Sequence, residues 1–379
     1  MNRFTATIIH IVPKMDLGGV EESTKLLLLQ LHSRGTSVTL ISSGGKFCET
    51  LLTHGIPIYF VPVDSRNPIT LFFNIFRIAK IVKKESAEII HCHSRAPAWS
   101  AYFSALLTKA HLVTTFHSYY GHRLVKKFYS RIMAKSDLVI TPSNELRTHI
   151  LQTYGTNPAK VIHLPHFVDL FPQINPSDID EFKIQYGIPQ NSKILTLVSR
   201  SSRWKNVDLA IKALNILSDR NIVLLIIGAS KGSAARHLKV NPSQKIDLSR
   251  NIKFIDGSRN NIAHAFLLSS CALSVSSSKP EGFGMTILEA LSCSLPVIAS
   301  NHGGSLDLID HKKNGFLFKP HDPSDLALKI KMLLALNKEE SLQMRSEAFN
   351  KASRYNPDFI VPKLQIIYEK LAEKTCKSN

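Results

Sequence analysis

The sequence predicts an α/β protein built from two doubly wound parallel sheets, each in a Rossmann-like domain of its own. Short apolar runs rich in Ile, Val and Leu alternate with helical patterns along the chain, which is typical of parallel α/β units. The alternation pauses at residues 165–176, a linker-like stretch rich in proline and aromatic residues, and then starts again. A chain of 379 residues is long enough for two domains of about 150–200 residues each.

The apolar runs before the pause predict strands at residues 6–12, 37–41, 58–61, 88–91, 111–116 and 138–141. Helices are expected among them at residues 20–34, 69–84, 96–108, 123–135 and 143–153. After the pause, strands are expected at residues 193–199, 222–227, 252–255, 271–276 and 295–299, and residues 323–373 have a helical pattern. Two doubly wound domains are expected to form a ligand cleft between the carboxyl ends of their strands.

The cysteines and the length of the apolar runs indicate where in the cell the protein is expected. The five cysteines are odd in number and show no CxxC spacing, so free thiols in a reducing cytosol are the simplest interpretation. The longest apolar runs are far shorter than the ~20 residues of a membrane-spanning helix. We therefore expect a cytoplasmic protein, peripheral on the inner face of the plasma membrane if its basic surface binds lipid.

The formal net charge of +18 indicates an anionic partner. Residues 66–84 carry five basic and no acidic side chains, and residues 111–135 carry the same number. Nucleic acid, anionic lipid and diphosphate ligands would all suit such a surface. Nucleic acid is disfavoured because the sequence shows no RNA- or DNA-binding motif.

The most informative stretch of the chain holds two carboxylates eight positions apart, Glu281 and Glu289. Pro280 and Gly282 disfavour a helix around Glu281. The run from Met285 onward predicts a helix with Glu289 about one turn inside it. A short apolar strand then leads to a second pair of glycines, at residues 303–304.

This arrangement suits a sugar nucleotide. Carboxylates accept hydrogen bonds from sugar or ribose hydroxyls, and the N–H groups at a helix start bind phosphate. Taken singly, Glu281 is equally well explained as a partner of the helix dipole and Glu289 as a solvated helix residue. The combination with the glycines and the strand favours a binding site.

Two further loops follow predicted strands. Gly18 and Gly19 come after the first strand and open a helix, and paired glycines there let a backbone approach a phosphate or sugar. A tight strand-to-helix turn is the alternative. In the second half, Arg200 and Lys205 lie between a strand and a helix, where two cations can neutralise a diphosphate leaving group without a metal. The alternative is that they are ordinary surface bases.

Three histidines are expected at the ligand edge of the first sheet. His91 and His93 end the fourth strand, and His117 ends the fifth, so all three are expected near the carboxyl ends of parallel strands. Isolated histidines are more often structural or surface residues. A zinc site is not favoured, because alternate residues of a strand point to opposite faces and no further ligand cluster is apparent.

The two basic segments allow a structural and a functional interpretation. Residues 71–84 place apolar side chains on one side of a helix, with cations at Arg77, Lys80 and Lys84. A helix packed on its sheet predicts this pattern, and so does an interfacial helix on anionic lipid. Residues 119–131 combine aromatic and basic side chains directly after His117, which fits either an acceptor or membrane contact or a solvated helix.

The segment Glu281-Gly-Phe-Gly-Met-Thr-Ile-Leu-Glu289-Ala resembles the paired-glutamate signature of the retaining family 4 glycosyltransferases, the glycosyl transferases group 1. Those enzymes have the two-Rossmann-domain architecture called GT-B. The resemblance implies an N-terminal acceptor domain at residues 1–170 and a C-terminal donor domain at residues 171–355. It also implies that a helix at residues 356–379 crosses back to the first domain.

The resemblance further implies roles for individual residues. Glu289 would bind the ribose and Glu281 the hydroxyls of the donor sugar. Arg200 and Lys205 would hold the diphosphate, Gly18 and Gly19 would close over the phosphates, and His117 would lie beside the transferred sugar. The implied catalytic residues are therefore His117, Glu281, Arg200 and Lys205, with no metal and no cofactor. The implied donor-binding set is Gly18, Gly19, Arg200, Lys205, Glu281, Gly282, Phe283, Gly284, Met285 and Glu289.

Two positions depart from the pattern of the family. Ser199 precedes Arg200 where the family usually has glycine, and residues 165–169 read Pro-His-Phe-Val-Asp where the family commonly shows Asn-Gly-Val-Asp. The first departure leaves the cations in place. At the second we infer only a hinge between the domains.

These observations predict a retaining, metal-independent glycosyltransferase. Its expected donor is a nucleotide-diphosphate sugar, and its expected acceptor is lipid-linked or a cell-surface glycan of lipopolysaccharide type. A GT-B epimerase or phosphorylase, which would turn over donor without an acceptor, is one alternative. A non-enzymatic GT-B protein that binds a nucleotide sugar is another, and it would tolerate loss of Glu281 or His117.

Overall fold

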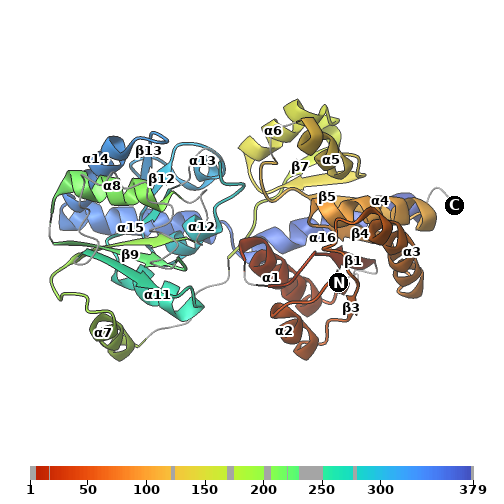
Figure 1. Ribbon diagram of the computed structural model, residues 1–379, viewed down its shortest axis with the longest axis horizontal. Helices are drawn as coiled ribbons and strands as arrows, with labels where there is room; N and C mark the ends of the chain where they lie inside the picture. Colours follow the sequence, from red (N-terminus) through yellow and green to blue (C-terminus); the bar gives the residue numbers. More distant parts are fainter. Residues whose placement is uncertain are drawn as a thin grey trace. The chain divides into compact units, whose positions relative to one another are not determined.

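The computed structural model describes residues 6–16, 18–120, 124–168, 175–199, 206–219, 221–229, 251–275 and 280–376. The chain divides into two compact units. The first unit comprises residues 1–169 and 355–379, and the second comprises residues 170–354. Each unit contains one parallel sheet with flanking helices (Figure 1). The predicted α/β class with two doubly wound, Rossmann-like domains is confirmed.

The first unit is built on a sheet of strand order β3-β2-β1-β4-β5-β6-β7. The order reverses direction between β1 and β4, which makes the carboxyl ends of these two strands the topological switch point of the sheet. The strands are β1 (Thr7–Ile11), β2 (Ser37–Ser42), β3 (Ile58–Phe60), β4 (Ile89–Cys92), β5 (His111–Thr115), β6 (Leu138–Thr141) and β7 (Val161–His163).

Helices cover both faces of this sheet. Ile9 and Ile11 of β1 belong to the core formed with α3, α4, α5 and α6, whereas Ile8 belongs to the core formed with α1, α2 and α16. This alternation is the period of two expected of a strand buried on both faces. The helices are α1 (Gly19–Ser33), α2 (Phe47–Thr53), α3 (Pro68–Lys84), α4 (Arg95–Thr108), α5 (Leu124–Ala134), α6 (Asn144–Tyr154) and α16 (Pro357–Cys376), with a 3-10 turn at Pro158–Lys160.

The C-terminal helix α16 packs in the first unit although it lies far away in sequence. Val361, Leu364 and Tyr368 are buried in the same core as Ile8 and Leu28. The Gln365 amide also donates a hydrogen bond of 2.8 Å to Thr36 Oγ1. In Figure 1 this blue helix runs beside the red and orange elements of the first unit.

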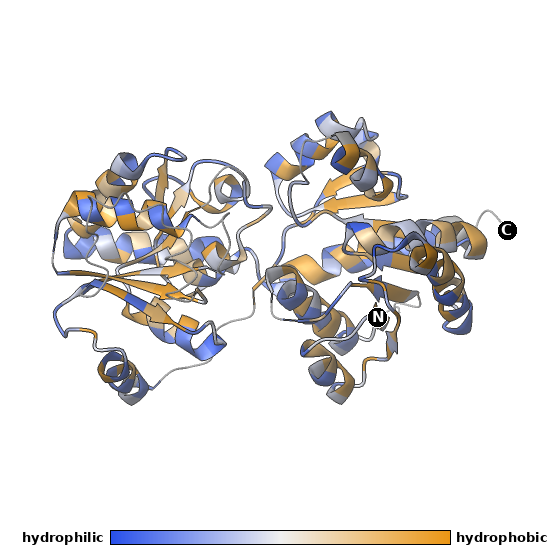
Figure 2. Cartoon of the chain, viewed as in Figure 1, coloured by the Kyte–Doolittle hydropathy of each residue, from blue (hydrophilic) through white to orange (hydrophobic). Residues whose placement is uncertain are grey.

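The second unit repeats the topology with order β10-β9-β8-β11-β12-β13, and its switch point lies between β8 and β11. Its strands are coloured as hydrophobic in Figure 2, as expected for a sheet covered on both faces. They are β8 (Lys193–Val198), β9 (Ile222–Ile227), β10 (Ile252–Ile255), β11 (Cys271–Ser274), β12 (Val297–Ser300) and β13 (Gly315–Phe318). The described helices are α7 (Pro176–Gln185), α8 (Val207–Leu217), α11 (Arg259–Leu268), α12 (Met285–Ser292), α13 (Ser305–Leu308), α14 (Pro323–Leu334) and α15 (Lys338–Ser353).

The first segment of the first unit ends at residue 169, within the stretch expected to be a linker, so part of that stretch belongs to the unit. Phe167 and Val168 are buried in the first unit, and the Val168 N–H donates to the Tyr355 carbonyl at 3.3 Å. Residues 165–168 are therefore part of the first unit, because their apolar side chains find a place in its core. Short elements such as α2, β7, α7 and β13 were also absent from the prediction, since each offers too few residues to show a clear period.

Candidate functional site

The paired-glutamate segment has the local structure predicted for it. Glu281 lies in the loop before α12, and Glu289 is the fifth residue of that helix. Gly284 caps the helix with φ of 105°, a left-handed conformation that glycine adopts without strain. The partial positive charge of the helix start is thus placed directly after Glu281.

The diglycine 303–304 braces this loop. The Gly304 N–H donates to the Glu281 carbonyl at 2.8 Å. A Cβ at Gly303 would lie 2.6 Å from the same carbonyl oxygen, and a Cβ at Gly304 would overlap the backbone of Phe283. Only glycine allows this close approach, so the two glycines fix the backbone that presents the Glu281 carboxylate.

The loop lies at the switch point of the second sheet. It follows β11, whose neighbour β8 leads into the segment that carries Arg200 and Lys205. In a doubly wound sheet this is the position where ligands bind. Arg200 and Lys205 themselves lie outside the described residues.

The glycine loop of the first unit is braced in a similar way. Gly18 caps α1, and its carbonyl accepts a hydrogen bond of 2.7 Å from the Glu22 N–H. The preceding Met15 backbone is held by residues 44–47, whose Gly45 has φ of 134° and would clash with Met15 if it carried a Cβ. A Cβ at Gly19, in contrast, would enter open space. The fold therefore requires glycine at position 45 but not at position 19. A glycine at position 19 would instead serve the approach of a ligand.

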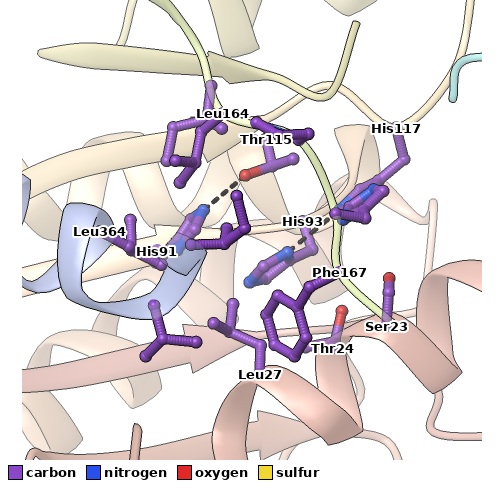
Figure 3. A pocket seen from close by; sticks show the side chains of 15 residues that line it. Ser23, Thr24, Leu27, His91, His93, Thr115, His117, Leu164, Phe167 and Leu364 are labelled. Atoms are coloured by element: carbon purple, nitrogen blue, oxygen red, sulfur yellow. Dashed lines mark hydrogen bonds between the residues drawn. The ribbon is translucent and has the colours of Figure 1, made fainter. Parts of the chain in front are cut away.

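Histidines from four strand ends meet at the switch point of the first sheet. His10 lies on β1, His93 follows β4, and His117 follows β5. Their rings are joined by hydrogen bonds, of 3.0 Å from His10 Nδ1 to His93 Nε2 and 3.1 Å from His93 Nδ1 to His117 Nε2. His166, three residues after β7, completes the row at 3.2 Å from His117 Nδ1. Figure 3 shows His93 pointing toward His117.

His91 lies beside this row, with its ring centroid 4.2 Å from that of His93, but its two nitrogens bond to other partners. Its Nδ1 lies 2.5 Å from the Tyr368 hydroxyl of α16. Its Nε2 lies 2.7 Å from Thr115 Oγ1 (Figure 3). Both of its nitrogens therefore have buried partners. His91 ties the C-terminal helix to the centre of the sheet.

Burial keeps these imidazoles neutral. It lowers the pKa of His10 to about 3 and that of His166 to about 4. The pKa values of His91, His93 and His117 are lowered well below the ordinary value, chiefly by burial and further by the neighbouring histidines. Burial has this effect because it removes water that would otherwise solvate the charged imidazole.

A small cavity of about 40 Å³ lies beside the row. Ser23, Thr24 and Leu27 of α1 form one wall, and Ile360, Val361 and Leu364 of α16 belong to the apolar part of its lining. His91, His93, His117 and His166 belong to its polar lining, and Figure 3 labels the first three of them. The cavity has room for about one water-sized group.

The reason for disfavouring a zinc site, that His91 and His93 point to opposite faces, is wrong. His91 and His93 are two residues apart and share a face, and His10 joins them, so that one ring nitrogen from each lies within 4.8 Å of the others. A metal would still have to break existing hydrogen bonds, because His91 and His93 use both of their nitrogens. The hydrogen-bonded row is therefore the better-supported interpretation.

His10, His166 and Gly45 were not predicted from the sequence to be site residues. A count by two along the central strands would have placed His10 on the same face as Ile8, and His166 lies in the stretch read as a hinge. Nothing local in the sequence indicates that residues 10, 93, 117 and 166 meet. Strand order alone brings them together.

Two protein-family models match this chain, one in each half. The family described as "Glycosyltransferase Family 4" matches residues 17–170, and "Glycosyl transferases group 1" matches residues 178–351. The chain belongs to the family 4 glycosyltransferases.

Individual relatives of this glycosyltransferase are distant in sequence, and the examples below cover between 83% and 97% of the chain. The UDP-Gal:alpha-D-GlcNAc-diphosphoundecaprenol alpha-1,3-galactosyltransferase of Escherichia coli is 28% identical over 83% of this chain and 84% of its own. The crystal structure of a glycosyltransferase from Rickettsia africae is 27% identical, with a TM-score of 0.86 over 97% of this chain and 98% of that one. Anabaena HepE, solved in complex with UDP, is 20% identical with a TM-score of 0.82 over 96% of this chain and all of its own, and shares the fold. The GT-B architecture is thereby confirmed.

The glycosyltransferase also presents an apolar and basic surface on its first unit. On α3, Phe72, Phe73 and Phe76 are each more than half exposed, and the Phe72 ring packs edge to face against the other two. Exposed apolar side chains continue on α4 and α5, and exposed cations accompany them. We call this set the α3–α5 surface: Ile69, Phe72, Phe73, Phe76, Arg77, Lys80, Lys83, Lys84, Phe103, Leu106, Leu107, Val125, Lys126, Lys127, Phe128 and Arg131.

Hydrogen bonds hold the three helices of this surface together. Ser100 and Ser104 of α4 donate to the carbonyls of Leu71 and Ile75 on α3, at 2.8 and 2.7 Å. Trp99 of α4 donates through Nε1 to the Tyr129 carbonyl of α5 at 3.2 Å. Within the 119–131 segment, Tyr119 is buried and the Arg95 guanidinium lies over the ring of Tyr120, 4.1 Å from its centroid. These two tyrosines thus belong to the interior, and the exposed aromatic residue is Phe128.

No helix among the described residues is both long and apolar enough to cross a bilayer.

Proposed function

We propose that the protein is a retaining, metal-independent glycosyltransferase that uses a nucleotide-diphosphate sugar. The observation that carries this proposal is the Glu281 loop, which is braced by residues 303–304 and enters α12 at the switch point of the second sheet. A fixed carboxylate directly before a helix start suits a ligand with both hydroxyl and phosphate groups. The solved complex of Anabaena HepE with UDP supports a donor of this class.

Each residue of the proposed donor site has a chemical task. Glu289 accepts hydrogen bonds from the ribose and Glu281 from the donor sugar, while Arg200 and Lys205 neutralise the diphosphate as it leaves. The bond from the anomeric carbon to the diphosphate breaks, and the acceptor oxygen bonds to that carbon on the same face of the sugar. The proton of the acceptor hydroxyl leaves with the diphosphate. Gly18 and Gly19 close over the phosphates, and His117 lies beside the sugar.

We further propose that the acceptor is lipid-linked and is met at an anionic membrane. The α3–α5 surface combines exposed aromatic and aliphatic side chains with cations, and residues 65–84 and 89–136 contain no acidic side chain. Such a surface binds anionic lipid through apolar contact and charge attraction, worth about 1 kcal/mol for each Lys or Arg near the membrane. The name of the Escherichia coli relative, which specifies a diphosphoundecaprenol acceptor, supports this proposal.

The donor is tested by turnover. Purified protein is incubated with UDP-, GDP-, ADP- and dTDP-sugars, with and without a lipid extract, and the free nucleoside diphosphate is measured. We expect release from one donor, increased by lipid and unaffected by EDTA. Glu289→Ala and Glu281→Ala should each lower donor affinity or turnover roughly 10- to 100-fold, because each removes hydrogen bonds to a charged group.

The matched control is Glu347→Ala, which removes an exposed helical carboxylate on α15 of the same unit and should leave turnover unchanged. Release that proceeds equally without any acceptor would favour an epimerase or phosphorylase. Donor binding without turnover, and unaffected by Glu281→Ala, would favour a non-enzymatic nucleotide-sugar-binding protein.

The membrane surface is tested separately by vesicle sedimentation. We expect binding to vesicles of phosphatidylglycerol and phosphatidylcholine, and little binding to phosphatidylcholine alone. Phe72→Ser with Phe76→Ser should weaken binding about tenfold or more, since each ring loses burial in the interface. Leu342→Ser is the control, because Leu342 is 59% exposed on α15, a helix whose first turn is acidic. Equal loss in both variants would contradict a specific membrane surface.

A further inference from the structure

The row of four histidines has a defined order of atoms. Each link joins Nδ1 of one ring to Nε2 of the next, from His10 through His93 and His117 to His166. His10 and His93 are fully buried, and His166 lines the cavity at the other end. At the inner end, His10 Nε2 is buried and has no hydrogen-bond partner among the described residues.

This order couples the tautomers of all four rings. A neutral imidazole has one N–H and one bare nitrogen, so three consecutive ring-to-ring hydrogen bonds exist together only if all run in one direction. Either every Nδ1 in the row donates, or every Nε2 does. The second arrangement would leave a buried N–H on His10 Nε2 without a partner, and such orphaned donors are rare. The first leaves only a bare nitrogen there.

We propose that His93, His10 and His166 are positioning residues that fix His117 as the Nδ1–H tautomer. This inference rests on the proposed function, in which His117 lies beside the transferred sugar. In this arrangement His93 Nδ1–H donates to His117 Nε2, and His117 Nδ1–H donates to His166. The row thereby decides that His117 meets a ligand as a hydrogen-bond donor.

The same geometry assigns the partner that a ligand displaces. Both nitrogens of His117 are occupied, so the ring can donate to a sugar hydroxyl only after it gives up one histidine. Release of His93 would strand a fully buried polar ring, whereas His166 is only partly buried, so its release costs less. A sugar hydroxyl oxygen therefore replaces His166 Nε2 as the acceptor of the His117 Nδ1–H.

The tautomer is measured directly. In protein labelled with 15N-histidine, long-range 1H–15N correlation spectra distinguish the Nδ1–H from the Nε2–H form of a neutral ring. We expect His93 and His117 to be neutral and Nδ1-protonated at pH 7. In His93→Phe, which fills the space without a hydrogen bond, we expect His117 to become a mixture of both forms. An Nε2–H form or a mixture for His117 in the wild type would overturn the proposal.

Kinetics supply the second readout. We expect His93→Phe to lower kcat roughly 10- to 100-fold with less than about a threefold change in donor KM, and His93→Gln to restore most of kcat because its amide still donates to His117. His54→Phe, at an exposed histidine of the same unit, should behave like the wild type. His93→Phe with unchanged tautomer and unchanged kcat would refute the positioning role. If the wild type turns over no donor, the proposed function fails, yet the spectra still decide the tautomer.

Discussion

The two units of this glycosyltransferase share one topology and differ in what they place at the switch point. The first sheet ends in neutral imidazoles, bonded ring to ring among buried apolar side chains. The second ends in a glycine-braced loop that carries a carboxylate into a helix start. The same strand order therefore hosts a row of hydrogen-bonded imidazoles in one unit and a carboxylate-bearing loop in the other. The loops and strand ends, rather than the sheet, decide the chemistry.

Lowering the pH should produce the largest difference in stability between the two units, because the histidines with lowered pKa values lie in the first unit. A histidine with a depressed pKa in the folded protein stays neutral below pH 6.5, whereas the same histidine takes up a proton in the unfolded chain. The free energy of unfolding is therefore unaffected above about pH 6.5 and decreases as the pH falls below that value. At pH 5.5 each such histidine costs about 1.4 kcal/mol of unfolding free energy. We expect the first unit to lose several kcal/mol of unfolding free energy, because five of its histidines have a lowered pKa. They are His10, His91, His93, His117 and His166.

The measurement is urea unfolding between pH 7.5 and 5.5, followed by fluorescence. Trp99 lies in the first unit, and Trp204→Phe removes the other tryptophan of the chain, which leaves a reporter on that unit alone. Tyr368, whose hydroxyl lies 2.5 Å from His91 Nδ1, is a further titratable group beside these histidines, and burial raises its pKa well above the ordinary value. His10→Leu should reduce the slope with pH. Stability that stays constant between pH 7.5 and 5.5 would contradict neutral buried imidazoles.

The two glycine pairs should respond in opposite ways to an added methyl group. Gly304→Ala places a Cβ against the Phe283 backbone, so we expect a loss of about 1–3 kcal/mol in stability of the second unit and a loss of donor binding. Gly19→Ala meets open space and should leave stability unchanged or slightly raised. Thermal unfolding and donor titration measure both effects.

A loss of stability in Gly19→Ala equal to that in Gly304→Ala would remove this distinction between the units. If Gly19→Ala folds normally but loses turnover, the glycine serves ligand approach, as proposed for the first unit.

Tyr368→Phe should weaken the tie between α16 and the first sheet. It leaves His91 Nδ1 buried without its 2.5 Å partner, which costs about 1–2 kcal/mol. Tyr59→Phe removes a hydrogen bond to Glu85 of the same 2.5 Å length at a partly exposed site and should cost less. Denaturant unfolding of both variants compares them. Equal losses would show that burial does not set the strength of the His91 contact.

Asn337→Ala should have the smallest effect and separates stability from function in the second unit. Asn337 and Glu340 form a capping box at the start of α15, whose loss costs about 1 kcal/mol. Although α15 packs against α12, the Glu281 loop is braced by residues 303–304, and no hydrogen bond joins Asn337 to that loop in the described structure. Donor affinity should therefore remain unchanged. A fall in affinity as large as that of Gly304→Ala would mean that stability alone limits the site.

Much of the fold follows from local sequence signals. Strands such as β1 and β9 are short runs of Ile, Val and Leu, and α12 begins where the sequence first allows a helix after Gly284. The Glu281 loop was placed correctly because proline and glycine restrict the backbone whatever surrounds them. The family signature also lies in consecutive residues. Arg200 and Lys205 remain predictions, because the described residues do not include them.

By itself, the sequence determined the alternation of strands and helices, the loop that carries Glu281, and the membership of the chain in its family, since each depends on neighbouring residues. Only the tertiary structure decided that His10, His93, His117 and His166 form one row. Those residues are up to 156 positions apart, and strand order brings them to one edge of the sheet. It also decided that residues 303–304 brace Glu281. The physical reason is that hydrogen bonding and close packing act through space, and a single sequence records only distance along the chain.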